Sequence, residues 1–127
     1  MALLFTPEHT LACREKIYPE DLTGEPMILT KKSSGYRMLF DIIMSQLNIK
    51  PCSIIETGNV QAIKQLTLSG MGITFLPLTA VEEELRQNKL VSLRWLGPEF
   101  SIFTQVLIHK NKWMSTALKA FIELIHD

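Results

Sequence analysis

Residues 66–77, LTLSGMGITFLP, decide the fold that this sequence predicts. An apolar helical pattern runs through a serine and two glycines into four branched or aromatic residues, and a proline follows. A helix that reverses onto its own sheet within so few residues needs a left-handed C-cap glycine and a second small residue that permits close approach. The stretch therefore predicts a helix, a tight turn at Gly70 and Gly72, and a strand at residues 73–76 that is buried on both faces.

Helical and strand patterns alternate along the rest of the chain. Residues that favour helix N-termini precede two apolar helical patterns, one after Ser33-Ser34-Gly35 and one after Thr57-Gly58-Asn59. Strands that alternate with helices of about 10 to 15 residues are typical of an α/β sandwich with mainly parallel strands. We expect strands at residues 2–5, 27–30, 53–56, 73–76, 90–95 and 102–109, and helices that begin near residues 35, 60, 77 and 115.

Side chains of three expected helices can be assigned to a face. Those that should face the core in the first of these helices are Tyr36, Leu39, Phe40, Ile43 and Leu47. In the helix that begins at Pro77, those that should point inward are Leu78, Val81 and Leu85. In the same helix Glu82 should pair with Arg86, and the glutamate run 82–84 should form a solvated face. The last helix carries Leu118, Phe121, Ile122 and Ile125 on one face.

Composition limits the class of protein. The chain has 127 residues, of which 46% are hydrophobic and 20% charged, so it can form one globular domain. Thirteen basic and thirteen acidic residues cancel, so the chain alone should not bind DNA. The isolated Cys13 and Cys52 fit reduced thiols, with Cys52 packed in or near the core. We expect a cytoplasmic location and no membrane contact, because no signal-like start or long apolar run is present, although a piece of a longer protein would have the same features.

Two strand-to-helix junctions are rich in hydroxyl and amide groups, at residues 30–35 and 57–60. In open α/β sheets, ligands bind beyond the carboxyl ends of the strands, where helix N-termini gather. Free backbone N–H groups, the helix dipole and short hydroxyls together can receive a small anion. The alternative is that these residues only cap their own helices.

Catalytic constellations are not evident in the sequence. His9, His109 and His126 are far apart and have no metal-ligand spacing, and no nucleophile elbow is present. We therefore expect no enzyme activity, no metal and no cofactor. Trp95 and Trp113 are interpreted as packing residues rather than as stacking platforms for a ligand.

Five fragments, in order, resemble one known family. They are PEHTLACREKIYPEDLTGEPMIL, SSGYRMLFD, ETGNVQAIKQLTLSGMGITFLP, VEEELRQNKLVSLRW and ALKAFIELI. Together they resemble the effector-binding domain of LysR-type transcriptional regulators over nearly the whole chain. The resemblance implies the fold of type 2 periplasmic binding proteins, with the second subdomain complete at about residues 15–100 and parts of the first at 1–14 and 101–127. The N-terminal winged helix-turn-helix of that family is not found here, so DNA contact is expected only through a part outside this chain.

The resemblance also implies which residues face a ligand. Ser33, Ser34 and Gly35 match one effector-facing loop, Thr57, Gly58 and Asn59 match a second, and Phe75 and Leu76 sit where a strand approaches the cleft. We therefore expect a sensor that binds a small anionic effector between subdomains and forms a homodimer or tetramer. The alternatives are an extracytoplasmic solute receptor and an enzyme on the same scaffold. We also expect exposed edges at residues 102–109 and an uncovered face at 118–125, which favour dimerisation through exchanged terminal segments.

Overall fold

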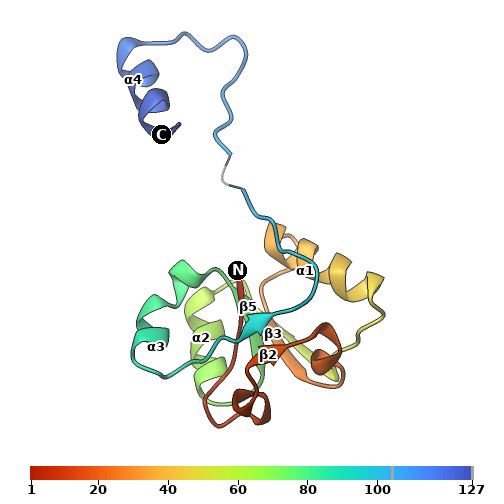
Figure 1. Ribbon diagram of the computed structural model, residues 1–127. Coiled ribbons are helices and arrows are strands. Elements are labelled where there is room, and N and C mark those ends of the chain that lie inside the picture. Colours follow the sequence, from red (N-terminus) through yellow and green to blue (C-terminus); the bar gives the residue numbers. More distant parts are fainter. Residues whose placement is uncertain (104, 127) are drawn as a thin grey trace.

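The computed structural model describes residues 1–103 and 105–126. Residues 1–100, here called the body, form a layered α/β unit. The described residues from 101 to 126, here called the tail, extend away from the body and end in helix α4 (Thr116–Ile125), which begins near residue 115 as expected and is capped by Ser115 (Figure 1). The α/β class that the sequence predicts is confirmed.

The body is built on a four-stranded sheet with the order β1-β5-β3-β4. These strands are β1 (Ala2–Leu4), β5 (Ile73–Leu76), β3 (Pro26–Leu29) and β4 (Ser53–Glu56). Strand β3 runs parallel to both β5 and β4, and β1 runs antiparallel to β5. The sheet is mainly parallel, as the alternation of strands and helices predicts.

Strand β1 joins the N-terminal residues to the sheet of the body. Ala2 lies opposite Leu76, so β1 belongs to the same sheet as the other three strands. The next residue, Phe5, exchanges hydrogen bonds with Val91.

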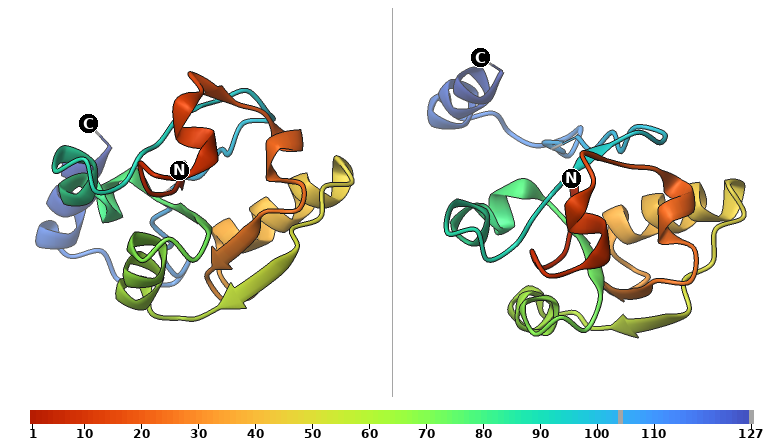
Figure 2. Two further views of the ribbon diagram at one scale, coloured as in Figure 1. Left: turned by 90° about the horizontal axis from the view of Figure 1, so that it is seen from below. Right: turned by 60° about the horizontal axis from the view of Figure 1, so that its bottom comes forward.

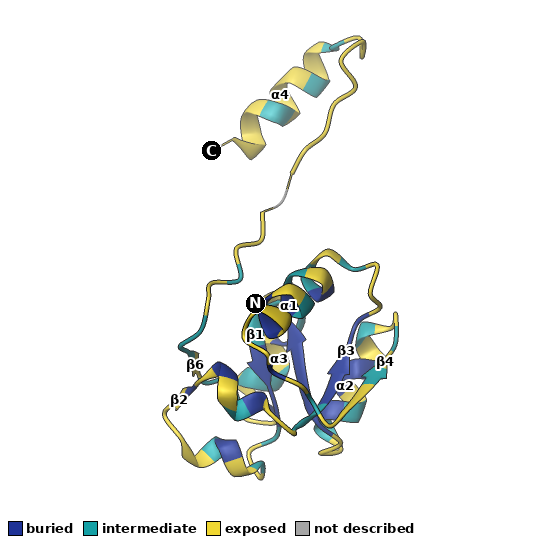
Figure 3. Cartoon of the chain, turned by 90° about the vertical axis from the view of Figure 1, so that its right-hand side faces the viewer, coloured by how far each residue is buried: buried dark blue, intermediate teal, exposed yellow. Residues whose placement is uncertain are grey.

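Helices cover both faces of the sheet, and alternate side chains of the strands point into one or the other of two hydrophobic cores. Helix α1 (Gly35–Gln46) packs on one face, and helix α2 (Val60–Leu68) packs on the other (Figures 1 and 2). The first core includes Phe40 and Phe75, and the second includes Ile63 and Leu76. Figure 3 shows the central strands as the most buried part of the molecule. Burial of each such side chain contributes about 1.5–3 kcal/mol.

The turn between α2 and β5 confirms the prediction from residues 66–77. Gly70 has a φ of 78°, a left-handed conformation that glycine adopts without strain. A Cβ at Gly72 would lie 2.5 Å from the carbonyl oxygen of Pro26, so only glycine allows this turn to lie against β3. All four residues of β5 are buried.

The helix expected after Pro77 is divided in two. A 3₁₀ turn, η3 (Leu78–Ala80), precedes helix α3 (Glu82–Arg86), and Val81 between them has a φ of −132°. This break turns Val81 into the core but leaves Leu78 exposed, which corrects the inward orientation expected for it.

Ion pairs around α3 also differ from the expectation. Arg86 pairs with Glu83 at i,i+3 rather than with Glu82. Glu84 does not lie on a solvated face, since Lys64 Nζ of α2 lies 2.6 Å from its Oε1 and also donates to the carbonyl of Ala80. The hydrogen bond from Lys64 lowers the pKa of Glu84, although burial opposes this effect. The pair joins α2 to the turn that follows β5.

The strands expected near the C-terminus are shorter or absent. Strand β6 (Arg94–Trp95) is two residues long and pairs parallel with β2 (Lys16–Ile17). The described residues between 102 and 109 form no strand, because no described strand lies alongside to take their hydrogen bonds. The two other 3₁₀ turns, η1 (Thr10–Cys13) and η2 (Pro19–Leu22), lie in the connector between β1 and β3.

Three further side chains that were expected to be buried are exposed. Leu47 is exposed because it lies at the C-cap of α1, beyond the last helical turn. Cys52 is exposed in the loop before β4, and both cysteines are free. Trp113 is exposed in the tail, whereas Trp95 packs on Phe100 as expected. Among the described residues, no helix is long and apolar enough to cross a membrane.

Candidate functional site

Two of the predicted loops lie side by side at the carboxyl edge of the sheet. Strands β3 and β4 pair so that Leu29 lies opposite Glu56, and the N–H of Thr57 donates to the carbonyl of Leu29 at 3.1 Å. The side chain of Lys31 crosses from the first loop to the second, since its Cε lies 3.2 Å from where a Cβ of Gly58 would be. The structure thus brings the loop of Ser33, Ser34 and Gly35 next to the loop of Thr57, Gly58 and Asn59.

The N-terminus of α1 has open hydrogen-bond donors. Ser34 is the N-cap, but its side chain makes no capping hydrogen bond. Within the described part of the chain, no acceptor takes the N–H groups of Gly35, Tyr36 and Arg37. These donors and the positive end of the helix dipole suit an anion. Because the Ser34 side chain makes no capping hydrogen bond, helix capping does not explain why a serine occupies this position.

The N-terminus of α2 is closed by its own cap. Asn59 Oδ1 accepts from the N–H of Gln61 at 2.9 Å and of Ala62 at 3.3 Å. Thr57 Oγ1 accepts from the N–H of Asn59 at 3.2 Å, so its hydroxyl hydrogen remains available as a donor. For Asn59 the structure supports the capping alternative, and for Thr57 it leaves the hydroxyl hydrogen available as a donor.

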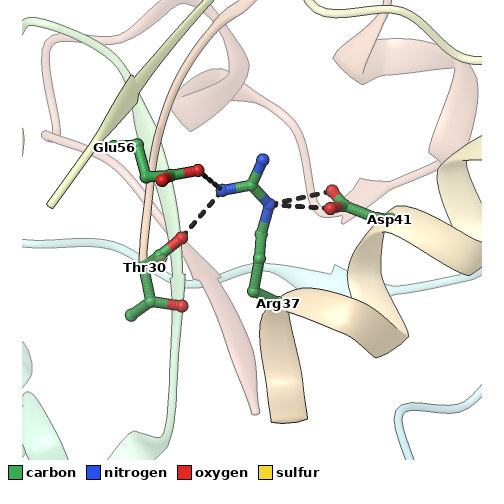
Figure 4. Close-up of polar contacts among 4 residues, drawn as sticks. All are labelled: Thr30, Arg37, Asp41 and Glu56. Atoms are coloured by element: carbon green, nitrogen blue, oxygen red, sulfur yellow. Dashed lines mark hydrogen bonds and ion pairs between the residues drawn. The ribbon is translucent and has the colours of Figure 1, made fainter. Parts of the chain in front are cut away.

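A buried arginine that the sequence did not reveal holds these loops together. Arg37 of α1 is 3% exposed, and its Nη1 donates to the carbonyl of Thr30 at 2.7 Å and to Glu56 Oε2 at 3.0 Å (Figure 4). Its Nε donates to both oxygens of Asp41 at 2.9 and 3.0 Å. One guanidinium therefore ties α1 to the ends of β3 and β4, and its two carboxylate partners more than neutralise its charge. The i,i+4 spacing of Arg37 and Asp41 was the only signal in the sequence.

Lys31 and Lys32 are positive groups next to this edge. Both side chains are exposed, and neither belongs to an ion pair among residues 1–103 and 105–126. Arg37 and its two carboxylate partners together carry a negative charge, so the two lysines are needed to make the charge next to the open donors of α1 positive.

Phe75 and Leu76 lie behind the edge rather than on it. Both side chains are buried, and the ring of Phe75 lies 5.3 Å from that of Phe40 and 4.3 Å from that of Phe100. Their side chains support the floor of the site and present no surface to a ligand within this chain.

No other chemistry is gathered at the edge. Among the described residues, no group of three or more His, Cys, Asp or Glu side chains could hold a metal ion. The edge therefore presents hydroxyl and amide donors and two lysines, together with the carboxylates of Glu56 and Asp41 that Arg37 holds.

The fold and this edge define an α/β ligand-binding unit of the periplasmic-binding-protein kind. The family model described as the LysR substrate binding domain matches residues 1–127, and the chain belongs to this family.

Relatives of known sequence are transcriptional regulators by name. The "Uncharacterized HTH-type transcriptional regulator YwqM" of Bacillus subtilis is 37% identical over 105 residues, which cover 83% of this chain and 35% of that protein. The "Probable RuBisCO transcriptional regulator" of a Synechocystis species is 34% identical over 125 residues, 96% of this chain and 36% of that protein. The chain thus spans about a third of the length of these relatives.

Solved structures share the fold. The regulatory domain of Synechocystis CcmR in complex with 2-PG superposes with a TM-score of 0.80 at 22% identity, over 98% of this chain and 60% of that chain. The effector-binding domain of QuiR in complex with shikimate superposes with a TM-score of 0.75 at 23% identity, over 96% of this chain and 57% of that chain. At this level of identity the likeness establishes the fold.

Proposed function

We propose that this chain is the ligand-sensing part of a LysR-type transcriptional regulator and that its ligand is a small anion. The observation that carries the proposal is the open N-terminus of α1, where the Ser34 side chain makes no capping hydrogen bond and Lys31 has no ion-pair partner among the described residues. Two domains of the same fold were solved with small molecules, 2-PG and shikimate, and shikimate is a carboxylic acid.

The proposed ligand lies between the two loops. Its negative group accepts hydrogen bonds from the N–H groups that follow Ser34 and from the hydroxyls of Ser33, Ser34 and Thr57. Gly35 and Gly58 allow close approach, because neither has a Cβ and the space at Gly35 is open. Asn59 positions the second loop as a cap, and Phe75 and Leu76 support the floor from behind.

The proposed signal is a change in the orientation of the body relative to its neighbouring segments. A ligand that binds better to one arrangement of the body and its neighbouring segments shifts the population toward that arrangement. DNA is contacted by a part of the regulator outside this chain, since the charges of this chain cancel. We place the protein in the cytoplasm as a homo-oligomer without catalytic activity. The transport and enzyme alternatives gain no support, because the relatives are transcriptional regulators.

Titration calorimetry with 2-PG, shikimate and inorganic phosphate tests the site. Lys31→Gln should weaken binding of the anion that binds best by about tenfold, the effect of one charge-assisted contact of about 1.4 kcal/mol. Thr57→Val should weaken it by a similar factor. Lys32→Gln is the matched control, because Lys32 is the next residue but lines a cavity with Arg37 and Asp41, whereas Lys31 lies against Gly58. Equal affinity in all three variants would show that the anion binds elsewhere.

A further inference from the structure

A cavity of about 380 Å³ lies between α1 and β4, beside the two loops of the candidate site. None of the residues 33–35 and 57–59 lines it, so it is separate from those loops. Every residue that lines it falls between Lys32 and Ile54, so the body alone forms the cavity and the tail takes no part. Its volume is within the roughly 300–1,000 Å³ that small-molecule sites occupy.

The turn after α1 forms part of the cavity wall. Asn48 has a φ of 55°, a left-handed conformation that ends the helix, and the N–H of Ile49 donates to the carbonyl of Met44 at 2.9 Å. The N–H of Gly24 donates to the carbonyl of Lys50 at 3.0 Å, which holds the turn against the segment before β3. Backbone hydrogen bonds therefore fix the shape of this wall.

The lining of the cavity is mainly apolar. Phe40 and Met44 of α1 and Ile49 of the turn line it, and each is no more than 6% exposed. Pro51 and Ile54 complete the apolar part, and Ile54 is 46% exposed on β4. An apolar group that displaces water from such a surface binds favourably.

A buried guanidinium borders this surface and has two donors left. Arginine carries five N–H donors, and those on Nε and Nη1 of Arg37 go to Asp41, Thr30 and Glu56 (Figure 4). Its Nη2 donates to no acceptor among the described residues, and this nitrogen is not one of the fully enclosed polar atoms. Because Arg37 lines the cavity and is only 3% exposed, Nη2 is available to a group that enters there.

The charge around the cavity is positive. The charged residues that line it are Lys32, Arg37, Asp41 and Lys50. Neither lysine belongs to an ion pair within residues 1–103 and 105–126, whereas Asp41 is held by Nε of Arg37. Three positive groups against one carboxylate favour an anion, and a guanidinium suits a carboxylate in particular.

We propose that this cavity is a second ligand site, which takes a small carboxylic acid with an apolar body. The carboxylate accepts from Nη2 of Arg37 and lies near the ammonium groups of Lys32 and Lys50. The apolar body lies on Phe40 and Met44 and displaces water from them. The proposal is independent of anion binding at the two loops, because those loops contribute no residue to the cavity.

Titration of the full chain with phenylacetate tests the proposal, with the methyl resonances of Met44 and Ile54 as the local readout. Phenylacetate should shift both resonances. Phenylacetamide has the same body without the charge and should bind at least about tenfold more weakly, the effect of one charge-assisted contact. Acetate has the charge without the body and should not shift the resonances at concentrations of phenylacetate that saturate them.

Variants of the lining separate the two contributions. Lys50→Gln should weaken the binding of phenylacetate about threefold to tenfold by removing a positive charge, and Ile54→Gln should weaken it similarly by removing apolar surface. The matched controls are Lys16→Gln, at an exposed lysine of β2, and Ile42→Gln, at a side chain of α1 that is 52% exposed. Neither residue lines the cavity, so both controls should bind phenylacetate as the wild type does.

The same titrations distinguish this site from the two loops. Binding that Lys31→Gln weakens and Lys50→Gln leaves unchanged would place the acid at the loops and overturn the proposal. Equal affinity for phenylacetate and phenylacetamide would also overturn it, because the guanidinium would then take no part. So would the absence of a shift in both methyl resonances.

Discussion

Replacement of Arg37 by methionine tests whether one buried guanidinium holds the two loops of the site. Methionine keeps much of the aliphatic volume of arginine and removes all of its donors. The main loss is at the carbonyl of Thr30, which is buried and accepts from Arg37 at 2.7 Å. An unsatisfied buried acceptor costs about 1–3 kcal/mol.

The ion pairs of Arg37 add less. The side chains of Asp41 and Glu56 are 40% and 39% exposed, so in the variant water can replace most of the hydrogen bonds that the guanidinium donates to them. Pairs of this kind contribute about 0.5 kcal/mol each. Arg37→Met should therefore lower the free energy of unfolding by about 2–4 kcal/mol, which corresponds to a fall in Tm of roughly 10–25 °C for a unit of this size.

Urea unfolding followed by circular dichroism measures this loss, with the slope m unchanged if the fold is retained. Arg86→Met is the matched control, because the side chain of Arg86 is 74% exposed and pairs only with Glu83. That variant should stay within about 0.5 kcal/mol of the wild type. If Arg37→Met were as stable as Arg86→Met, the guanidinium would not be what joins α1 to β3 and β4.

Gly72→Ala should lower the free energy of unfolding by about 3 kcal/mol or more, because its Cβ would lie 2.5 Å from the carbonyl oxygen of Pro26; an unchanged Tm would contradict the close approach of the turn and β3. Glu84 has a lowered pKa in the folded state, so its pairing with Lys64 stabilises the protein at neutral pH and is lost as the pH falls below about 4. Urea unfolding at about pH 7 and about pH 3 should therefore show Glu84→Gln less stable than the wild type at the higher pH and nearly equal to it at the lower. Asn59→Ala should lose about 1 kcal/mol while Asn59→Asp keeps the cap, and equal thermal stability of the two variants would exclude the capping role.

The sequence predicted the helices, strands and turns whose boundaries depend on residues that are close together in the chain. Helix α1 begins after Ser34 as expected, β4 has the predicted bounds, and Asn59 caps α2. The turn at Gly70 could be predicted because only glycine adopts its φ without strain. In each case the residues that decide the structure are close together in the chain.

Features that depend on distant partners could not be predicted. Arg37 pairs with Glu56, which is 19 residues away, and Lys64 of α2 pairs with Glu84 of α3. The spacing of these residues in the sequence does not indicate either contact. The residues from 102 have the apolar pattern of a strand, but a strand also requires a neighbour. The positions of Ser34 and Thr57 followed from the alternation of strands and helices, whereas the placement of Lys31 against Gly58 of the second loop appears only in the structure.

Both ends of the body line one cavity. Met1 and Phe100 border the same cavity of about 320 Å³, and β1 pairs with β5 so that Ala2 lies opposite Leu76, at the carboxyl edge of the parallel strands. The tail leaves the body beside this cavity. Any polypeptide joined at residue 1 would therefore meet the body next to the tail, and a change in the packing around this cavity would act on both connections at once.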